Sequence, residues 1–317
     1  MKRSKLVITA GLLLASLVSY SQGCNDAGLC SMGDLDGKGL TANNKYNTQI
    51  SYTFGLGEKQ SLINTIVFEQ RFLLLKDRGQ VFVQLPFHYV NGNLGQTVGV
   101  GDISLGFNYT YLKKKDLSAS FMIALKVPSN DANKTIDGKG APMVYQTSLG
   151  NYDYALGANF FYRKWQLGLG YLKPLGSNKN YFYHEEWPDN ADALEYDQMQ
   201  DLARGDDGMI RINRFFHTKK NRYNVGLLAL YRLQKDKVTQ YGERVALDNS
   251  DGFTLNINLG YQKVLKNSDA ITLSVAAPLI TREVRVDGLT RTFVIMFTYA
   301  FSTKKKDDGI FKAVDFN

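Results

Sequence analysis

Glu69 and Arg71 lie two residues apart between Phe68 and Phe72, in a stretch rich in apolar residues. Side chains on a β-strand point alternately to its two faces, so this spacing predicts both charges on one face. Opposite charges gathered around a narrow passage can select solutes by charge and hydrogen bonding. The same charges can also pair with each other and fill space, and the sequence leaves both interpretations open.

Similar polar side chains recur at alternate positions along much of the chain. If the apolar face of each stretch points outward, the polar faces share one interior, and seven charged residues are the candidates for a constriction. These seven are Glu69, Arg71, Asp102, Lys126, Asp153, Arg163 and Arg211. The other residues expected on this interior face are Gln80, Gln84, His88, Asn108, Asn159, Asn213, Asn224, Arg232, Asn256, Asn258 and Gln262.

An acidic stretch at 175–207 offers a second kind of chemistry. Glu185, Glu186, Asp189 and Asp192 supply the oxygen ligands that Ca²⁺ prefers, and they are weak candidates for a metal site. Their spacing matches no defined calcium loop. A solvated acidic face is the alternative.

Catalysis is not indicated by the residues. The three histidines, His88, His184 and His217, include none that shares an apolar face with a suitable serine, as a nucleophile and its base would require at a lipid surface. We find no phosphate-binding glycine loop and no nucleic-acid motif. The sequence therefore predicts a protein that is not an enzyme, needs no cofactor and binds no nucleic acid.

The elements that position these residues are strands with a period of two. Residues 253–262, FTLNINLGYQ, place apolar side chains at every odd position and polar residues or glycine at every even one. Twelve such segments are expected: 46–55, 61–75, 79–90, 99–112, 117–127, 151–162, 165–174, 208–217, 222–233, 252–264, 270–281 and 291–302.

Segment length and connection length together predict the fold. Most segments approach the roughly 9–11 residues that a tilted membrane-spanning strand needs. Their connections alternate between short turns, such as KDRG, and longer loops, such as residues 175–207. That alternation is typical of outer-membrane barrels, which have tight turns at one end and long loops at the other. We therefore predict an all-β fold, a closed antiparallel transmembrane β-barrel of about 12 strands over residues 45–302.

Both ends of the chain differ from the segments between them. Residues 1–21 carry Lys and Arg before an apolar run, which predicts a secretory signal peptide cut between Ser21 and Gln22. Residues 22–44 are expected to form a coil or plug, in which Cys24 and Cys30 form a disulfide. Lipidation of Cys24 and a metal clip are the alternatives. Residues 303–317 are expected to be a polar periplasmic tail.

Three stretches in the middle of the chain resemble a known family. "GVGDISLGFNYTY" at 99–111, "ALKVPS" at 124–129 and "SLGNYDYALGANFFYRKWQLGLGYLKPL" at 148–175 are similar to the outer-membrane transporters named for the meta-pathway of phenol degradation. The resemblance covers about 80 residues, and its motifs are glycine-rich strand starts and hairpins. It implies a channel for small, often hydrophobic or aromatic molecules.

These observations lead to one expected function and one alternative. The expected function is passive diffusion of a small-molecule substrate through a barrel in the outer membrane of a Gram-negative bacterium, in contact with outer-membrane lipids. The alternative is a structural or adhesive barrel with a closed lumen, whose acidic loop meets an extracellular partner. Homo-oligomers are compatible with either function.

Overall fold

The computed structural model describes residues 46–75, 78–218, 221–265, 269–288 and 292–302. The expected signal peptide at 1–21, the lead at 22–44 with Cys24 and Cys30, and the tail at 303–317 lie outside the described residues. They stay predictions.

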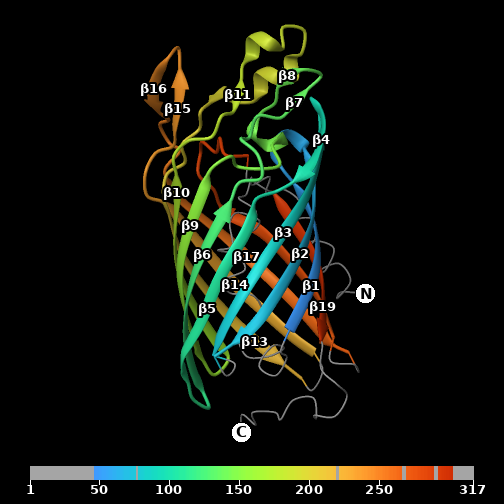
Figure 1. The fold of residues 1–317 in the computed structure, drawn as a ribbon, viewed down its shortest axis with the longest axis vertical. Coiled ribbons are helices and arrows are strands. Elements are labelled where there is room, and N and C mark those ends of the chain that lie inside the picture. Colours follow the sequence, from blue (N-terminus) through green and yellow to red (C-terminus); the bar gives the residue numbers. More distant parts are fainter. Residues whose placement is uncertain (1–45, 76–77, 219–220, 266–268, 289–291, 303–317) are drawn as a thin grey trace, which may run out of the picture.

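Twelve long strands build one barrel (Figure 1). Most contain 10 to 13 residues, close to the length predicted from the sequence. The strands are β1 (Tyr46–Leu56), β2 (Leu62–Leu74), β3 (Gly79–Gly92), β5 (Ile103–Lys113), β6 (Leu117–Val127), β9 (Tyr152–Tyr162), β10 (Trp165–Leu175), β13 (Asp207–His217), β14 (Asn221–Arg232), β17 (Gly252–Val264), β18 (Ala270–Ile280) and β19 (Phe293–Ser302).

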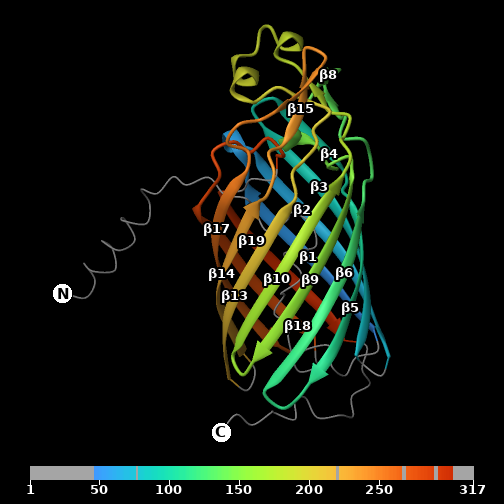
Figure 2. The same cartoon turned by 90° about the vertical axis from the view of Figure 1, so that its left-hand side faces the viewer.

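Antiparallel pairing closes the barrel completely. Each long strand pairs with its sequence neighbour, and β1 pairs with β19, so that Asn47 lies opposite Ser302. Closure leaves no unpaired edge, which a membrane-spanning sheet requires because lipid cannot satisfy backbone hydrogen bonds. Figures 1 and 2 show the strands tilted around one common axis. The predicted closed antiparallel barrel of about 12 strands is confirmed.

One predicted strand is interrupted. The segment expected at 99–112 is divided into a short β4 (Gly95–Val100), which pairs with the upper part of β3, and β5. Gly101 lies at the break, where the His88 ring occupies the space that a side chain would need. The break bends the chain so that Asp102 faces the lumen at the rim of the barrel.

The apolar face of each strand points outward. In β17, Phe253 and Leu259 are 42% and 49% exposed, whereas the alternating Thr254 and Asn256 are 0% and 1% exposed. An exposed apolar band on a closed barrel is a surface suited to lipid rather than water. The protein is thus an outer-membrane β-barrel of a Gram-negative bacterium. Within the described ranges, no helix has the length and hydropathy to cross a membrane.

The long loops are ordered at one end of the barrel. They contain short elements: β7 (Thr135–Ile136), β8 (Lys139–Gly140), β11 (Tyr181–Phe182), β12 (Met199–Gln200), β15 (Lys237–Gln240), β16 (Glu243–Ala246) and the 3-10 turns η4 (Met143–Tyr145), η5 (His184–Glu186) and η6 (Ala191–Glu195). A further 3-10 turn, η3 (Glu58–Gln60), lies in the short connection between β1 and β2. We call the loops 128–151, 176–206, 233–251 and 281–288 the cap.

The cap has an apolar core of its own. Ala132, Met143, Leu202, Val238 and Val286 come from all four loops and form one buried cluster. These loops leave the barrel at strands on different sides of the mouth, since β6 and β9 lie far from β18 and β19 in the strand order. A cluster that joins them must span the mouth. A second cluster, around Tyr145, Phe182 and Trp187, packs the cap against β2 and β3.

Candidate functional site: the lumen and its cap

Glu69 and Arg71 lie together on the lumen face of β2, as their spacing predicted. The Arg71 Nε donates to Glu69 Oε1, and the Gln84 side chain on β3 donates to Glu69 Oε2. Both charged residues are buried. The strand pairing explains this cluster, because Glu69 is directly opposite Gln84 in the β2–β3 register. The role of this pair in a constriction stays a prediction.

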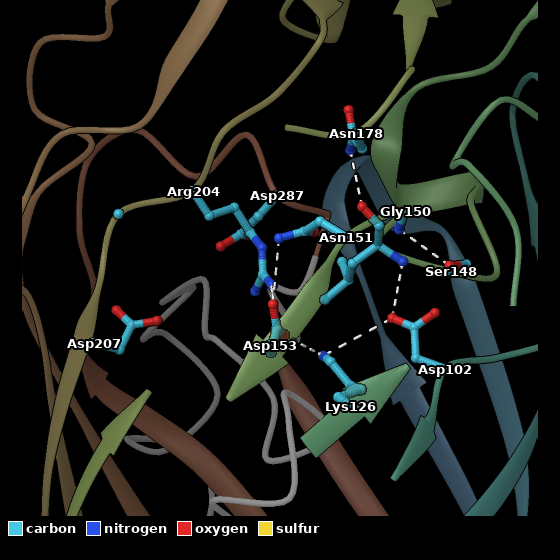
Figure 3. A network of polar contacts seen from close by, with 12 residues as sticks. Asp102, Lys126, Ser148, Gly150, Asn151, Asp153, Asn178, Arg204, Asp207 and Asp287 are labelled. Atoms are coloured by element: carbon cyan, nitrogen blue, oxygen red, sulfur yellow. Dashed lines mark hydrogen bonds and ion pairs between the residues drawn. The ribbon is translucent and has the colours of Figure 1, made fainter. Parts of the chain in front are cut away.

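Asp102, Lys126 and Asp153 meet at the extracellular rim of the lumen (Figure 3). The Lys126 Nζ lies 2.9 Å from Asp153 Oδ2 and 3.9 Å from Asp102 Oδ2. Arg204, from the loop before β13, completes the group with its Nη2 at 2.5 Å from Asp153 Oδ1. The Asp153 and Arg204 side chains are each 1% exposed. Charges alternate through this chain of four, so each carboxylate faces a cation.

The same group holds the cap to the barrel. Asp102 accepts hydrogen bonds from the backbone N–H of Leu149 at 3.0 Å and of Ser129 at 3.4 Å, both in loop 128–151. Arg204 ties loop 176–206 to β9 through Asp153. Two residues predicted to line a constriction, Asp102 and Asp153, are therefore also attachment points of the cap.

Arg163 is an exception to the predicted lumen set. It lies in the two-residue turn between β9 and β10, is exposed, and has a positive φ of 52°. Its guanidinium stacks over the Tyr162 ring at 5.3 Å from the centroid. Strand alternation does not continue through such a turn, so the prediction that placed Arg163 in the lumen is wrong.

Arg211 is buried on the lumen face of β13, two residues from Asn213. Next to it the amide side chains form a chain across three strands. The Asn213 Nδ2 donates to Gln166 Oε1 at 2.8 Å, and the Gln166 Nε2 donates to Asn159 Oδ1 at 3.1 Å. This direction of donation leaves the Asn213 carbonyl oxygen pointing onward toward β14.

The lumen wall also carries an apolar patch. Its side chains lie between the rim charges and the amides, on the inward faces of six strands. The members are Phe82, Met122, Ala124, Ala155, Leu172, Met209 and Leu228. The inward faces of the strands therefore carry a buried apolar cluster as well as hydrogen-bonding groups.

A second ionic cluster joins the cap to the ends of β13 and β14. Arg232, with a side chain that is 0% exposed, donates to Asp207 at 2.6 and 3.0 Å, to Asp236 at 2.5 Å and to Asp287 at 3.1 Å. Arg282 lies 3.5 Å from Asp287 and 4.0 Å from Asp236. Burial raises the pKa of the Asp236 carboxyl, although the Arg232 guanidinium acts in the opposite direction.

The acidic loop does not form the metal site that was weakly expected. Glu186 accepts the Gly140 backbone N–H at 2.7 Å, and Glu185 and Asp189 are exposed. Asp192 lies in η6, where its backbone N–H donates to Asn190. In the described part of the chain, no three His, Cys, Asp or Glu side chains are grouped so that they could hold a metal ion.

Several of the residues that matter most here were not singled out by the sequence. Arg204 and Asp206 belong to an Arg-Gly-Asp tripeptide, but Arg204 pairs with Asp153, and Asp206 accepts from the Tyr171 hydroxyl at 2.5 Å. Asp207 is likewise buried rather than part of a solvated acidic face. Their partners lie on other strands, and no local pattern identifies them.

The fold is similar to that of solved outer-membrane channels. A COG4313 outer membrane channel from Pseudomonas putida F1 gives a TM-score of 0.61 at 14% identity, over 81% of this chain and 94% of that chain. NanC porin gives 0.46 at 8% identity, over 82% and 100% of the two chains, and KdgM porin gives 0.41 at 10% identity, over 81% and 99%.

No family model matches the sequence. No curated protein matches it either. The resemblance of residues 99–175 to the transporters named for phenol degradation therefore stays a prediction.

Proposed function

We propose that this protein is an outer-membrane channel that passes small molecules by passive diffusion. The observation that carries the proposal is the state of the polar groups on the lumen wall. Buried side-chain atoms there, including Gln80 Nε2, Asn108 Oδ1 and Asn258 Oδ1, have no hydrogen-bond partner among the described residues.

Such atoms favour a passage over a plugged interior. A barrel that is only filled by packing pairs its buried polar groups, because an unpaired one costs about 1–3 kcal/mol. Unpaired groups on a lumen wall are instead suited to exchange hydrogen bonds with water and a passing solute. The fold shared with the Pseudomonas putida F1 channel supports the same proposal.

The apolar patch gives the proposed substrate a second property. Met122, Leu172 and Leu228 form a buried apolar cluster on the inward faces of their strands. In the proposed passage, the apolar portion of a solute is transferred from water to this apolar cluster. That transfer is favourable, whereas a wholly polar wall offers no such gain. We therefore propose small molecules with hydrophobic portions as substrates.

The cap favours a second candidate, the barrel with a closed lumen. Gly288 packs so closely on the Met143 backbone that loops 128–151 and 281–288 touch across the mouth. A cap that never opens would leave a structural or adhesive barrel. Conductance separates the two candidates.

Purified barrels should conduct ions in planar lipid bilayers, once a heat-dependent shift in gel migration has shown that they are folded. We expect single-channel steps in the wild type and larger or more frequent ones in Arg204→Gln, which loses the contact between loop 176–206 and Asp153. If correctly folded barrels are silent in both forms, the channel proposal fails and the closed barrel is supported.

The Glu69–Arg71 pair should influence which ions pass. Arg71→Gln leaves a lumen carboxylate without its cation and is expected to raise the preference for K⁺ over Cl⁻ a few-fold, whereas Glu69→Gln should shift the preference toward Cl⁻. Reversal potentials in a KCl gradient measure both effects. Arg163→Gln, in the exposed turn, is the control and should leave the potential unchanged. Shifts of the same sign in both lumen variants would show that the pair does not line the ion path.

A further inference from the structure

We propose that four amide carbonyl oxygens on β13, β14 and β17 form a subsite in the lumen for an uncharged solute that donates hydrogen bonds. The residues are Asn213, Asn224, Asn258 and Gln262. The inference rests on the proposed channel function and specifies the class of solute that the passage recognises.

The strand register brings the four residues together. Asn213 and Asn258 are both directly opposite Gly226, one on each side of β14. Asn224 is directly opposite Gly260 on β17, and Gln262 is the next lumen-facing residue beyond Gly260. Gly226 leaves side-chain space between the amides, and both the Asn213 carbonyl oxygen and the Asn258 Nδ2 reach into that space.

All four carbonyl oxygens lack a partner. Asn213 Oδ1, Asn224 Oδ1, Asn258 Oδ1 and Gln262 Oε1 are inaccessible atoms without a hydrogen bond among the described residues. The Asn213, Asn224 and Gln262 residues are 2%, 9% and 3% exposed. The Asn213 amide cannot simply turn around, because its Nδ2 already donates to Gln166. Four acceptor oxygens on three adjacent strands therefore have no donor among the described residues.

The charge around the acceptors selects against ionic ligands. Carbonyl oxygens repel an anion, and the Arg211 guanidinium, two residues from Asn213 on the same face, offsets the attraction that these oxygens have for a cation. A neutral molecule with O–H or N–H groups satisfies the acceptors at no electrostatic cost.

Current block by three related solutes tests the subsite. Glucose, gluconate and glucosamine share a carbon skeleton but are neutral, anionic and cationic at neutral pH. We expect glucose to block the ion current at the lowest concentration. The double variant Asn224→Leu with Asn258→Leu, which removes two acceptors at nearly constant volume, should raise the half-blocking glucose concentration about tenfold.

Asn64→Leu is the matched control, because Asn64 lies on the outward face of β2, where its Oδ1 accepts a hydrogen bond from the Tyr52 hydroxyl at 2.6 Å. It should leave the glucose block unchanged. The subsite alone is overturned if the channel conducts but glucose blocks the double variant as strongly as the wild type. It is also overturned if gluconate or glucosamine blocks more strongly than glucose through the same asparagines. A barrel that never conducts overturns the channel itself.

Discussion

Replacing Arg232 by methionine is expected to release the cap from the ends of β13 and β14 while the barrel itself persists. The substitution keeps much of the side-chain volume but leaves Asp207, Asp236 and Asp287 around a site that has lost its central cation. Breaking a buried ion pair by removing one partner costs about 3–5 kcal/mol. Local opening of the cap should therefore become at least about 100-fold more frequent.

Limited trypsin digestion measures this opening. Lys235 and Lys237 lie in loop 233–251, and cleavage after them should become at least about 100-fold faster. The gel band of the folded barrel, which shifts on heating, should be retained. Arg232→Lys keeps the charge but not the forked geometry that reaches three carboxylates, so an intermediate rate is expected.

Arg244→Met provides the matched control in the same loop. Arg244 is exposed and donates to the Asp201 carbonyl at 2.5 Å and to Thr239 at 3.3 Å. Its loss should change cleavage by no more than about twofold, as for most surface substitutions. Equal cleavage of the Arg232 and Arg244 variants would mean that the buried cluster does not fasten the cap.

The barrel could be predicted from the sequence because its signal is local. Alternation in residues 253–262 identifies a strand and its lipid face without any knowledge of distant residues. The same alternation placed Glu69 and Arg71 on one face of a strand. Alternation gave the wrong position for Arg163, because a residue in a two-residue turn with a positive φ lies on no strand face.

The cap could not be predicted in the same way. Asp153 and Arg204 are separated by 51 positions, and Arg232 and Asp287 by 55. Composition alone suggests that acidic loop residues are solvated, since buried charges are rare unless they are paired. Their partners become known only when the closed barrel brings the ends of distant strands to one rim.

Arg204→Gln is expected to open the lumen. Asp153 keeps its ion pair with Lys126 at 2.9 Å, so the barrel wall retains a compensated carboxylate. Loop 176–206 loses the buried, charge-assisted hydrogen bond that fixes it to β9, at a cost of about 1.5–3 kcal/mol to the closed arrangement. Since about 1.4 kcal/mol is a tenfold change in an equilibrium, the ratio of open to closed channels should rise by about 10- to 100-fold.

Lys179→Gln separates this effect from a general loosening of the loop. Lys179 pairs with Asp131 at 2.9 Å within the same cap, but both side chains are well exposed, and exposed ion pairs contribute little. Open probability in planar bilayers should therefore be unchanged in Lys179→Gln and much higher in Arg204→Gln. If Arg204→Gln also conducts like the wild type while trypsin shows its loop detached, the cap is not the barrier to permeation, and the resistance lies deeper, among the lumen charges around Glu69.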